Sequence, residues 1–250
     1  MESFSRSIKS VMTMTAALKS TKQAKNAKGF GAVKIYETLR SEILSLVLEP
    51  SQLIDEVSIA ARFKVSRSPV REALVRLATE SLLQTLPNKG TIVAPLRIEE
   101  FPQYVDALDL LQRAVTRLAA SNRDSVDIEK IYQAQARYAK CVEAGDVQGM
   151  ILGNRDFHAA IAHAGKNRYL EQSYCQVLDD GLRSLRLYFK SFGDVIPPKL
   201  TEGHLQIIHA IENQDVELAE SLAREHTREM QVRFLDYLGS RHIEDIGVAI

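Results

Sequence analysis

Three histidines and one asparagine in the second half of the chain have the residue types and spacing of a metal site. Asn154 and His158 lie four residues apart, so both would project from one face of a helix. His204 and His226 each lie in line with aliphatic residues at helical spacing, which predicts that both face a core. Imidazole nitrogens are preferred ligands of zinc and similar divalent ions. If these helices meet in one bundle, the three histidines can converge on a divalent ion and Asn154 can lend an oxygen.

The alternative interpretation of these histidines is structural. A neutral imidazole can be buried with a single hydrogen bond, so a lone histidine on an apolar helix face is usually a core residue. The two cysteines, Cys141 and Cys175, do not form a Cys-x-x-Cys pair, so a disulfide framework or a thiolate zinc site is not indicated. Any metal chemistry therefore depends on the histidines.

A second set of residues, in the first half of the chain, has the chemistry of DNA recognition. Arg67 and Arg71 lie four residues apart and would share one face of a helix whose opposite face is apolar. Arginine can pair with O6 and N7 of guanine, while Ser66 and Ser68 and the first amides of the helix can hold phosphate. The alternative is that these arginines are ordinary solvated charges.

These side chains need three helices and a hairpin to position them. Apolar spacing and turn residues predict a helix over 33–48, a second opening at 55 or 56, a third capped by Ser66, and strands over 82–86 and 91–94. Three helices followed by a hairpin make a winged helix-turn-helix. Lys89 and Gly90 would lie at the tip of the wing and approach the DNA backbone or minor groove.

The remainder of the chain is predicted to be helical throughout. Amphipathic segments are predicted at 99–121, 125–145, 147–164, 167–191, 199–213 and 215–239. The predicted fold class is mainly α, an N-terminal winged helix-turn-helix followed by an all-α antiparallel helical bundle. The expected organisation is a mobile basic arm over 1–30, the DNA-binding domain over 31–97, the bundle over 98–240 and a C-terminal tail over 241–250.

The zero net charge of the 250 residues conceals a division between these parts. Residues 1–97 contain 15 Lys and Arg against 8 Asp and Glu, whereas residues 98–250 contain 17 against 24. A basic segment beside an acidic one is typical of a nucleic-acid-binding module carried by a second domain that stays off the phosphates. The arm over 1–30 would either contact phosphates as well or remain a solvated tail.

The sequence lacks the signature motifs of several classes of enzyme. The sequence has no Gly-rich phosphate loop, no Gly-x-Ser-x-Gly elbow and no dinucleotide-binding fingerprint, which argues against nucleotide hydrolysis, esterase and dehydrogenase activities. No apolar run reaches the roughly 18 residues of a membrane span, and the first 28 residues lack the apolar centre of a signal peptide. We therefore expect a cytoplasmic protein without membrane contact.

The segment Ser66-Arg67-Ser68-Pro69-Val70-Arg71-Glu72-Ala73-Leu74, followed by Gly90-Thr91-Ile92-Val93, closely resembles the winged-helix signature of GntR-family transcription regulators. The resemblance implies that Arg67, Ser68 and Arg71 contact the operator and that Lys89 and Gly90 contact it from the wing. Two positions depart from the family pattern. Ser81 stands where the family usually has glycine, so its side chain would strain the helix end. Val57 stands where some relatives carry a DNA-reading arginine.

The bundle resembles the FCD ligand-binding domain of the FadR subfamily, within its six-helix VanR-like group. Phe157-His158, Asn167, His204 with Ile207 and Ile208, and His226 carry this resemblance. The family places an Asp or Asn and three histidines around a metal, commonly zinc or nickel, beside an organic-acid effector. Carried over, the ligands are Asn154, His158, His204 and His226. Because Asn154 removes the charge of the usual Asp, the metal affinity should be lower.

The resemblance leaves the effector's cation open. The family often has Arg and Glu where this chain has Leu108 and Gln112, so a carboxylate would need another partner. The candidates are Arg113, Arg183 and Arg186.

The expected function is a homodimeric DNA-binding regulator, a repressor or an activator. It would bind a short inverted repeat and respond to a small organic acid. Two alternatives stay open: the same regulator with a metal-free acyl or carboxylate pocket, and a metal-dependent hydrolase fused to a DNA-binding domain. Against the hydrolase, no His-Glu-x-x-His motif occurs.

Overall fold

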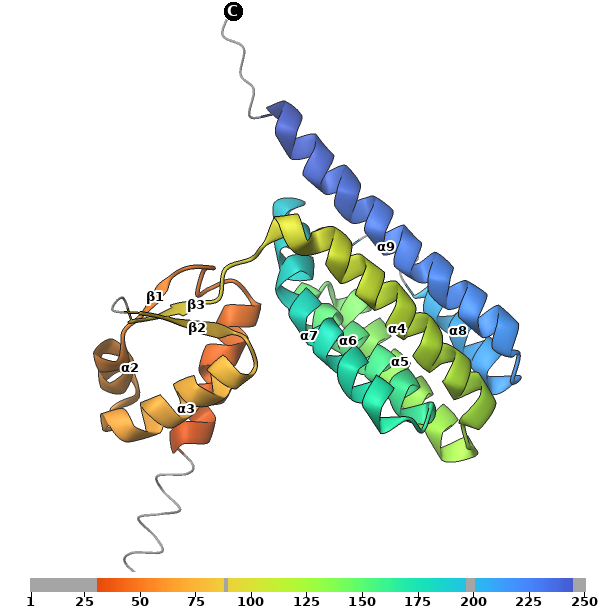
Figure 1. Cartoon of the computed structure of the whole chain (residues 1–250), viewed down its shortest axis with the longest axis horizontal. Helices are drawn as coiled ribbons and strands as arrows, with labels where there is room; N and C mark the ends of the chain where they lie inside the picture. Colours follow the sequence, from red (N-terminus) through yellow and green to blue (C-terminus); the bar gives the residue numbers. More distant parts are fainter. Residues whose placement is uncertain (1–30, 88–89, 197–200, 245–250) are drawn as a thin grey trace, which may run out of the picture. The chain divides into compact units, whose positions relative to one another are not determined.

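The structure is a computed structural model that describes residues 31–87, 90–196 and 201–244. The predicted arm over 1–30 and Lys89 lie outside the described residues. The chain divides between Pro95 and Leu96 into two compact units (Figure 1). Among the described residues, each helix is either too short or too polar to span a membrane.

The N-terminal unit is a winged helix-turn-helix, as the sequence predicted. Its elements are a first helix over 31–44, β1 (Leu53–Ile54), α2 (Glu56–Phe63), α3 (Arg67–Thr79), β2 (Leu83–Leu86) and β3 (Gly90–Val93). The sheet order is β1-β3-β2, with both pairs antiparallel. Gln84 of β2 and Leu53 of β1 both face Ile92 of the central strand. The two-residue strand β1 was not predicted, because two residues are too few to show an alternating pattern.

The first helix ends at residue 44, so the expected end at Leu48 was wrong. Leu46 takes a left-handed conformation with φ 58°, and the N–H of Val47 donates to the carbonyl of Glu42 at 2.9 Å. This hydrogen bond closes the helix before Glu49-Pro50 is reached. The position of Leu46 in the core, 6% exposed, explains why a bulky residue occupies this turn.

Local capping sets the limits of α2 and α3. The Asp55 carboxylate accepts hydrogen bonds from the N–H groups of Val57 and Ser58, which fixes the start of α2. Ser66 occupies the cap position of α3 as expected, but its side chain makes no capping hydrogen bond. At the other end of α3, Ser81 has φ 56°. The helix end is therefore strained where glycine is absent, as the departure from the family pattern suggested.

The C-terminal unit is the predicted helical bundle. Its helices are α4 (Phe101–Asn122), α5 (Ser125–Ala144), α6 (Val147–Ala164), α7 (Arg168–Ser191), α8 (Glu202–Glu212) and α9 (Val216–Glu244), preceded by the short 3-10 turn η1 (Ile98–Glu100). These bounds lie within a few residues of the six predicted segments, except that α9 continues past residue 240, where we expected the bundle to end. The side chains of Asp124, Asp146 and Asn167 cap α5, α6 and α7.

The bundle core lies where α4, α5, α6, α8 and α9 meet. It contains Phe157, Ile161, Ile207, Ile211 and Ala219, none more than 1% exposed. Short connections join α4 to α5, α5 to α6 and α6 to α7, so consecutive helices run antiparallel (Figure 1). This core fixes the faces of α6, α8 and α9 on which the three candidate histidines lie.

Candidate functional site

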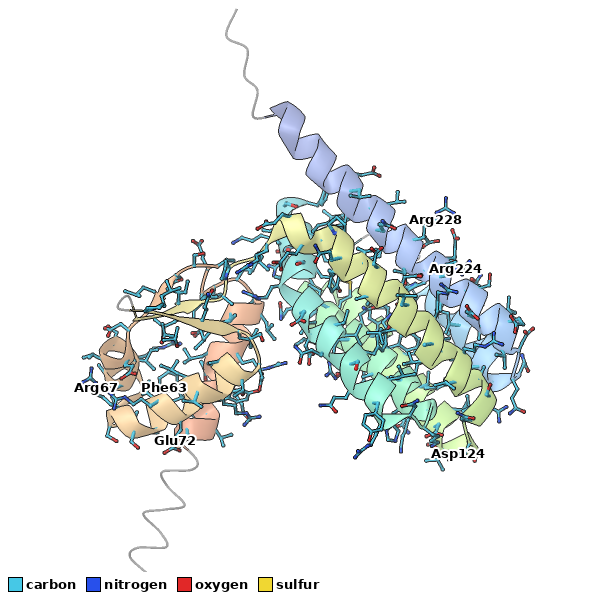
Figure 2. The ribbon with its side chains drawn as sticks, viewed as in Figure 1. Phe63, Arg67, Glu72, Asp124, Arg224 and Arg228 are labelled. Atoms are coloured by element: carbon cyan, nitrogen blue, oxygen red, sulfur yellow. The ribbon has the colours of Figure 1, made fainter. Side chains whose placement is uncertain are left out.

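The exposed face of α3 carries the residues predicted to read DNA. Ser66, Arg67, Ser68 and Arg71 are all exposed, whereas Val70 on the opposite face is fully buried. Figure 2 shows the Arg67 side chain on the outside of the N-terminal unit. The apolar contacts therefore anchor the helix through one face and leave the other free to enter a major groove.

A carboxylate on α2 links the two arginines. Arg71 Nε donates to Glu56 Oε2 at 3.0 Å, and Arg67 Nε lies 4.0 Å from the same oxygen. The arginine side chains remain 57% and 63% exposed for Arg67 and Arg71, so their guanidinium groups stay accessible. Glu56 was not predicted as part of this site, because nothing in the local pattern shows that the first turn of α2 lies against the first turn of α3.

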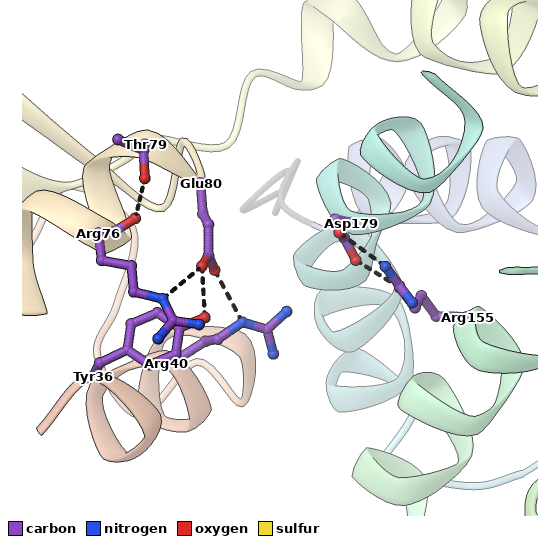
Figure 3. A network of polar contacts seen from close by, with 7 residues as sticks. All are labelled: Tyr36, Arg40, Arg76, Thr79, Glu80, Arg155 and Asp179. Atoms are coloured by element: carbon purple, nitrogen blue, oxygen red, sulfur yellow. Dashed lines mark hydrogen bonds and ion pairs between the residues drawn. The ribbon is translucent and has the colours of Figure 1, made fainter. Parts of the chain in front are cut away.

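The other end of α3 is fixed to the first helix by a polar cluster around Glu80 (Figure 3). Tyr36 Oη donates to Glu80 Oε1 at 2.6 Å, and Arg40 Nε donates to Glu80 Oε2 at 3.1 Å. The Arg76 guanidinium lies 3.6 Å from the Tyr36 ring centroid, a cation–π contact. Burial, followed by the hydrogen bond with Glu80, raises the pKa of Tyr36. These contacts hold the orientation of the recognition helix.

At the wing, Gly90 begins β3 with φ 89°, a conformation that favours glycine. A Cβ at this position would meet Leu53 Cδ1 at 3.6 Å, which is ordinary contact, so the backbone angle rather than space requires glycine. The roles of Gly90 and Lys89 in DNA contact stay predictions.

In the C-terminal unit, the three predicted histidine ligands come together from three helices. His158 of α6, His204 of α8 and His226 of α9 each offer a ring nitrogen, and these atoms lie within 4.8 Å of one another. The ring centroids are 4.9 Å apart for His204 and His226, and 5.2 Å for each pair that includes His158. Helical spacing correctly predicted that all three face inward.

His204 shows how the cluster fits a metal ion. Its Nδ1 lies 2.9 Å from Oε1 of the buried Gln135 on α5, so Nδ1 carries the proton and donates it to the amide oxygen. Its Nε2 therefore holds a lone pair, yet it is buried without a hydrogen-bond partner among the described residues. An unpartnered ring nitrogen beside two other imidazoles is the donor arrangement that zinc and similar ions bind.

Burial keeps all three imidazoles neutral, which is the state that binds metal. It lowers the pKa of His226 to about 4, with a smaller contribution from the positive charge of Arg233. Burial and the neighbouring His226 also hold the pKa values of His158 and His204 well below the ordinary range. At neutral pH each ring therefore keeps one unprotonated nitrogen that can bind a metal ion.

The cluster borders a cavity of about 130 Å³. Asn154, His158 and His226 line its wall, together with many aromatic and aliphatic side chains of α4, α5, α6, α7 and α9. His204 lies behind them, and its ring stacks on Phe157 with centroids 4.0 Å apart. The structure thus brings the predicted Asn154 to the same wall as two of the histidines. Its coordination of a metal stays a prediction.

The three arginines predicted for the effector do not line this cavity. Arg113 donates to Glu220 and Asp109, and Arg186 donates to Asp194 through its two terminal guanidinium nitrogens. Arg183 is buried, which lowers its pKa.

Two other arginines, Arg155 and Arg233, form part of the wall, and neither was predicted from the sequence. The available signal was the spacing of Arg233, which lies seven residues after His226 and so on the same face of α9.

Gln112 has a structural role in the cavity wall. Its side-chain amide donates to the carbonyl of Ala223 on α9 at 3.1 Å and accepts from the hydroxyl of Tyr174 on α7 at 3.1 Å. Because both ends of the amide are engaged, Gln112 ties α4 to two neighbouring helices and has little left to offer a ligand.

The fold and the two sites define a DNA-binding regulator with a separate helical domain that contains a cavity. Comparison with known proteins agrees. Residues 32–93 match bacterial regulatory proteins of the gntR family, and residues 103–229, just over half of the chain, match the FCD domain. The chain belongs to the GntR family of transcriptional regulators, in the branch with a C-terminal FCD domain. It is a transcriptional regulator rather than an enzyme.

The chain aligns with known transcriptional regulators over most of their length. The chain is 26% identical to the transcriptional repressor RspR of Escherichia coli K12 over 203 residues, 79% of this chain and 86% of the relative. It is 27% identical to the gluconate operon transcriptional repressor of Bacillus subtilis 168 over 201 residues, 76% and 79% of the two chains. The solved structure of E. coli McbR/YncC shares the fold, with a TM-score of 0.70 at 19% identity over 83% of this chain and 98% of that one.

Proposed function

We propose that this regulator is a homodimeric repressor that binds an inverted-repeat operator and releases it when a small organic acid binds at a metal site in the bundle. Relatives named as repressors support the direction of regulation. A dimer presents two identical recognition helices, and this symmetry favours an operator with two inverted half-sites. Binding to the chromosome places its action in the cytoplasm.

The observation that carries the sensor proposal is the buried, unpartnered Nε2 of His204 within 4.8 Å of two other histidine ligand atoms. Leaving a buried polar atom without a partner costs about 1–3 kcal/mol, which a bound ion would recover. We assign His158, His204 and His226 as the ligands, and Asn154 as an oxygen donor from the same wall. A divalent ion, zinc or nickel by donor type, would supply a positive centre for an acid at the cavity.

Neighbouring residues would hold the ring of His204 in place for such an ion. Gln135 fixes the ring of His204 through Nδ1, and Phe157 stacks against the same ring. The aromatic contacts would also stabilise a purely structural histidine cluster. They therefore support the metal-free alternative equally, and the metal content decides between the two.

Elemental analysis of purified, tag-free protein after dialysis tests the metal site. We expect a near-stoichiometric divalent ion in the wild type and strong loss of it in His204→Gln and His226→Gln. The matched control is His209→Gln, on the same helix as His204 but with a side chain that is 63% exposed. Unchanged metal content in the two cluster variants, or no metal in the wild type, would overturn the metal site.

Selection from random-sequence DNA, followed by binding measurements, tests the operator. We expect an inverted repeat, a dimer by light scattering, and loss of operator preference in Arg67→Ala and Arg71→Ala. Each bidentate arginine contact is worth about 1–3 kcal/mol of discrimination. Arg62→Ala, at an exposed arginine of α2 that pairs with Glu42, is the control. Retained sequence preference in both α3 variants would refute the assignment of the recognition helix.

A further inference from the structure

We infer that the cavity beside the histidine cluster takes a small monoanionic acid with an apolar body about the size of one aromatic ring, and that Arg233 is the cation that recognises its carboxylate. This inference rests on the proposed effector function and specifies the chemistry of that site.

The cavity wall favours an apolar body. Six aromatic side chains line it, from α4, α5, α7 and α9: Phe101, Tyr104, Tyr138, Tyr188, Phe189 and Phe234. Two methionines, Met150 and Met230, add adaptable apolar surface. An apolar cavity of about 150 Å³ is known to hold one benzene molecule. The volume here, about 130 Å³, therefore suits a body of ring size.

Two polar side chains of the lining, Gln112 and Thr227, are already engaged by protein partners. Gln112 uses both ends of its amide, and the Thr227 hydroxyl donates to the carbonyl of Ala223 at 3.2 Å. A polyhydroxylated acid would bring several hydroxyl groups into this space, and each one left without a partner costs about 1–3 kcal/mol. Together with the aromatic lining, this favours acids with an unsubstituted body over sugar acids.

Of the two arginines in the wall, Arg155 is committed to the protein. Its Nε and Nη2 donate to the two carboxylate oxygens of Asp179 at 2.8 and 3.2 Å (Figure 3). Such a bidentate pair leaves little for a ligand. Arg233 contacts Glu229 at 3.5 Å, one turn back on the same helix, and the two side chains are 42% and 56% exposed. An exposed pair of this kind is worth at most about 1 kcal/mol, so a ligand can displace it.

The direction of the Arg233 side chain brings its charge to the histidine end of the cavity. Long side chains on a helix lean toward its N-terminus, and the contact with Glu229 shows that Arg233 does so here. Glu229 is three residues after His226, so the guanidinium lies within about one turn of the cluster along α9. Consistent with this, Arg233 and His226 both line the same cavity. A single carboxylate beside the cluster is therefore within the influence of Arg233.

Calorimetric titration of the full-length protein with three probes tests this inference. Benzoate is the ring-sized apolar monoacid, benzamide is its neutral analogue, and gluconate has the same charge on a hydroxylated body. We expect benzoate to bind at least tenfold more tightly than either of the others. Arg233→Gln should remove at least tenfold of the benzoate affinity and leave benzamide unchanged. Arg228→Gln, at an exposed arginine of the same helix (Figure 2), should behave as the wild type.

The outcomes separate this inference from the proposed function. Tighter binding of gluconate, no measurable binding of benzoate, or an equal benzoate affinity in Arg233→Gln would each overturn the inference, whatever the metal content. Conversely, absent metal with benzoate binding that still depends on Arg233 would overturn the metal site and uphold the ligand chemistry. Elemental analysis of Arg233→Gln should show the same metal content as the wild type, which distinguishes a lost ligand contact from a disrupted cluster.

Discussion

Ser81 ends the recognition helix in a backbone conformation that disfavours side chains, so glycine there should stabilise the N-terminal unit. Its φ is 56°, and two hydrogen bonds hold it in place: the N–H of Ser81 donates to the carbonyl of Ala78, and that of Leu82 to the carbonyl of Leu77, both at 3.0 Å. This is the Schellman arrangement, in which the residue at the position of Ser81 is usually glycine. The buried Leu82 prevents the turn from relaxing.

The expected gain follows from two opposing contributions. A side chain in the left-handed region costs about 1–2 kcal/mol, which Ser81→Gly would relieve. Glycine also has more conformational freedom in the unfolded chain, which offsets about 0.4–1 kcal/mol of that gain. The net stabilisation should be about 0.5–1 kcal/mol, or a rise of about 2–8 °C in the melting temperature of a unit of this size.

Urea and thermal unfolding of the full-length protein measure this effect, with Ser81→Ala as the matched control. Alanine removes the hydroxyl but keeps a Cβ in the left-handed region, so its effect should stay within about 0.5 kcal/mol. Operator affinity should be unchanged in both variants, since Ser81 lies at the opposite end of α3 from Arg67. Equal stabilisation by alanine, or destabilisation by glycine, would refute the strain argument.

Three further predictions concern charge and protonation. Glu56→Gln should raise affinity for non-operator DNA several-fold and reduce the preference for operator, because Arg67 and Arg71 lose the carboxylate that orients them and a charge that repels phosphate. Gln135→Leu should weaken metal binding by about 10–100-fold in a chelator competition, because His204 loses the partner of Nδ1. The free energy of unfolding of the metal-free protein should be highest above about pH 6.5. It should fall toward pH 4, by roughly 3 kcal/mol from His226 alone, because the unfolded chain takes up protons that the buried ring excludes.

Each of these has an outcome that contradicts it. Glu72→Gln removes an exposed carboxylate from α3 itself, and a shift in specificity as large as that of Glu56→Gln would show that only net charge matters. Wild-type metal affinity in Gln135→Leu would mean that the hydrogen bond to His204 does not orient a ligand. A pH profile unchanged when His226 is replaced by Phe would show that this ring does not govern acid stability.

The sequence was informative wherever a local pattern decides the structure. Helical spacing placed His158, His204 and His226 on inward faces, and the limits of the bundle helices followed from capping residues such as Asp124 and Asn167. It failed at the end of the first helix, because a left-handed leucine at position 46 is rare and only its tertiary burial makes it tolerable.

Gln135 and Glu56 were not predicted for one physical reason: each contacts a partner that is distant in the sequence. Gln135 meets His204 across 69 positions, and Glu56 meets Arg71 across 15. Periodicity tells which face of a helix is buried, but not which neighbouring helix covers it or which polar group completes a site there. The predicted arginines illustrate this limit, since Arg113 has the right type but faces Glu220 rather than the cavity. Arg233 was the exception that spacing alone could have found, because it repeats the face of His226 on a single helix.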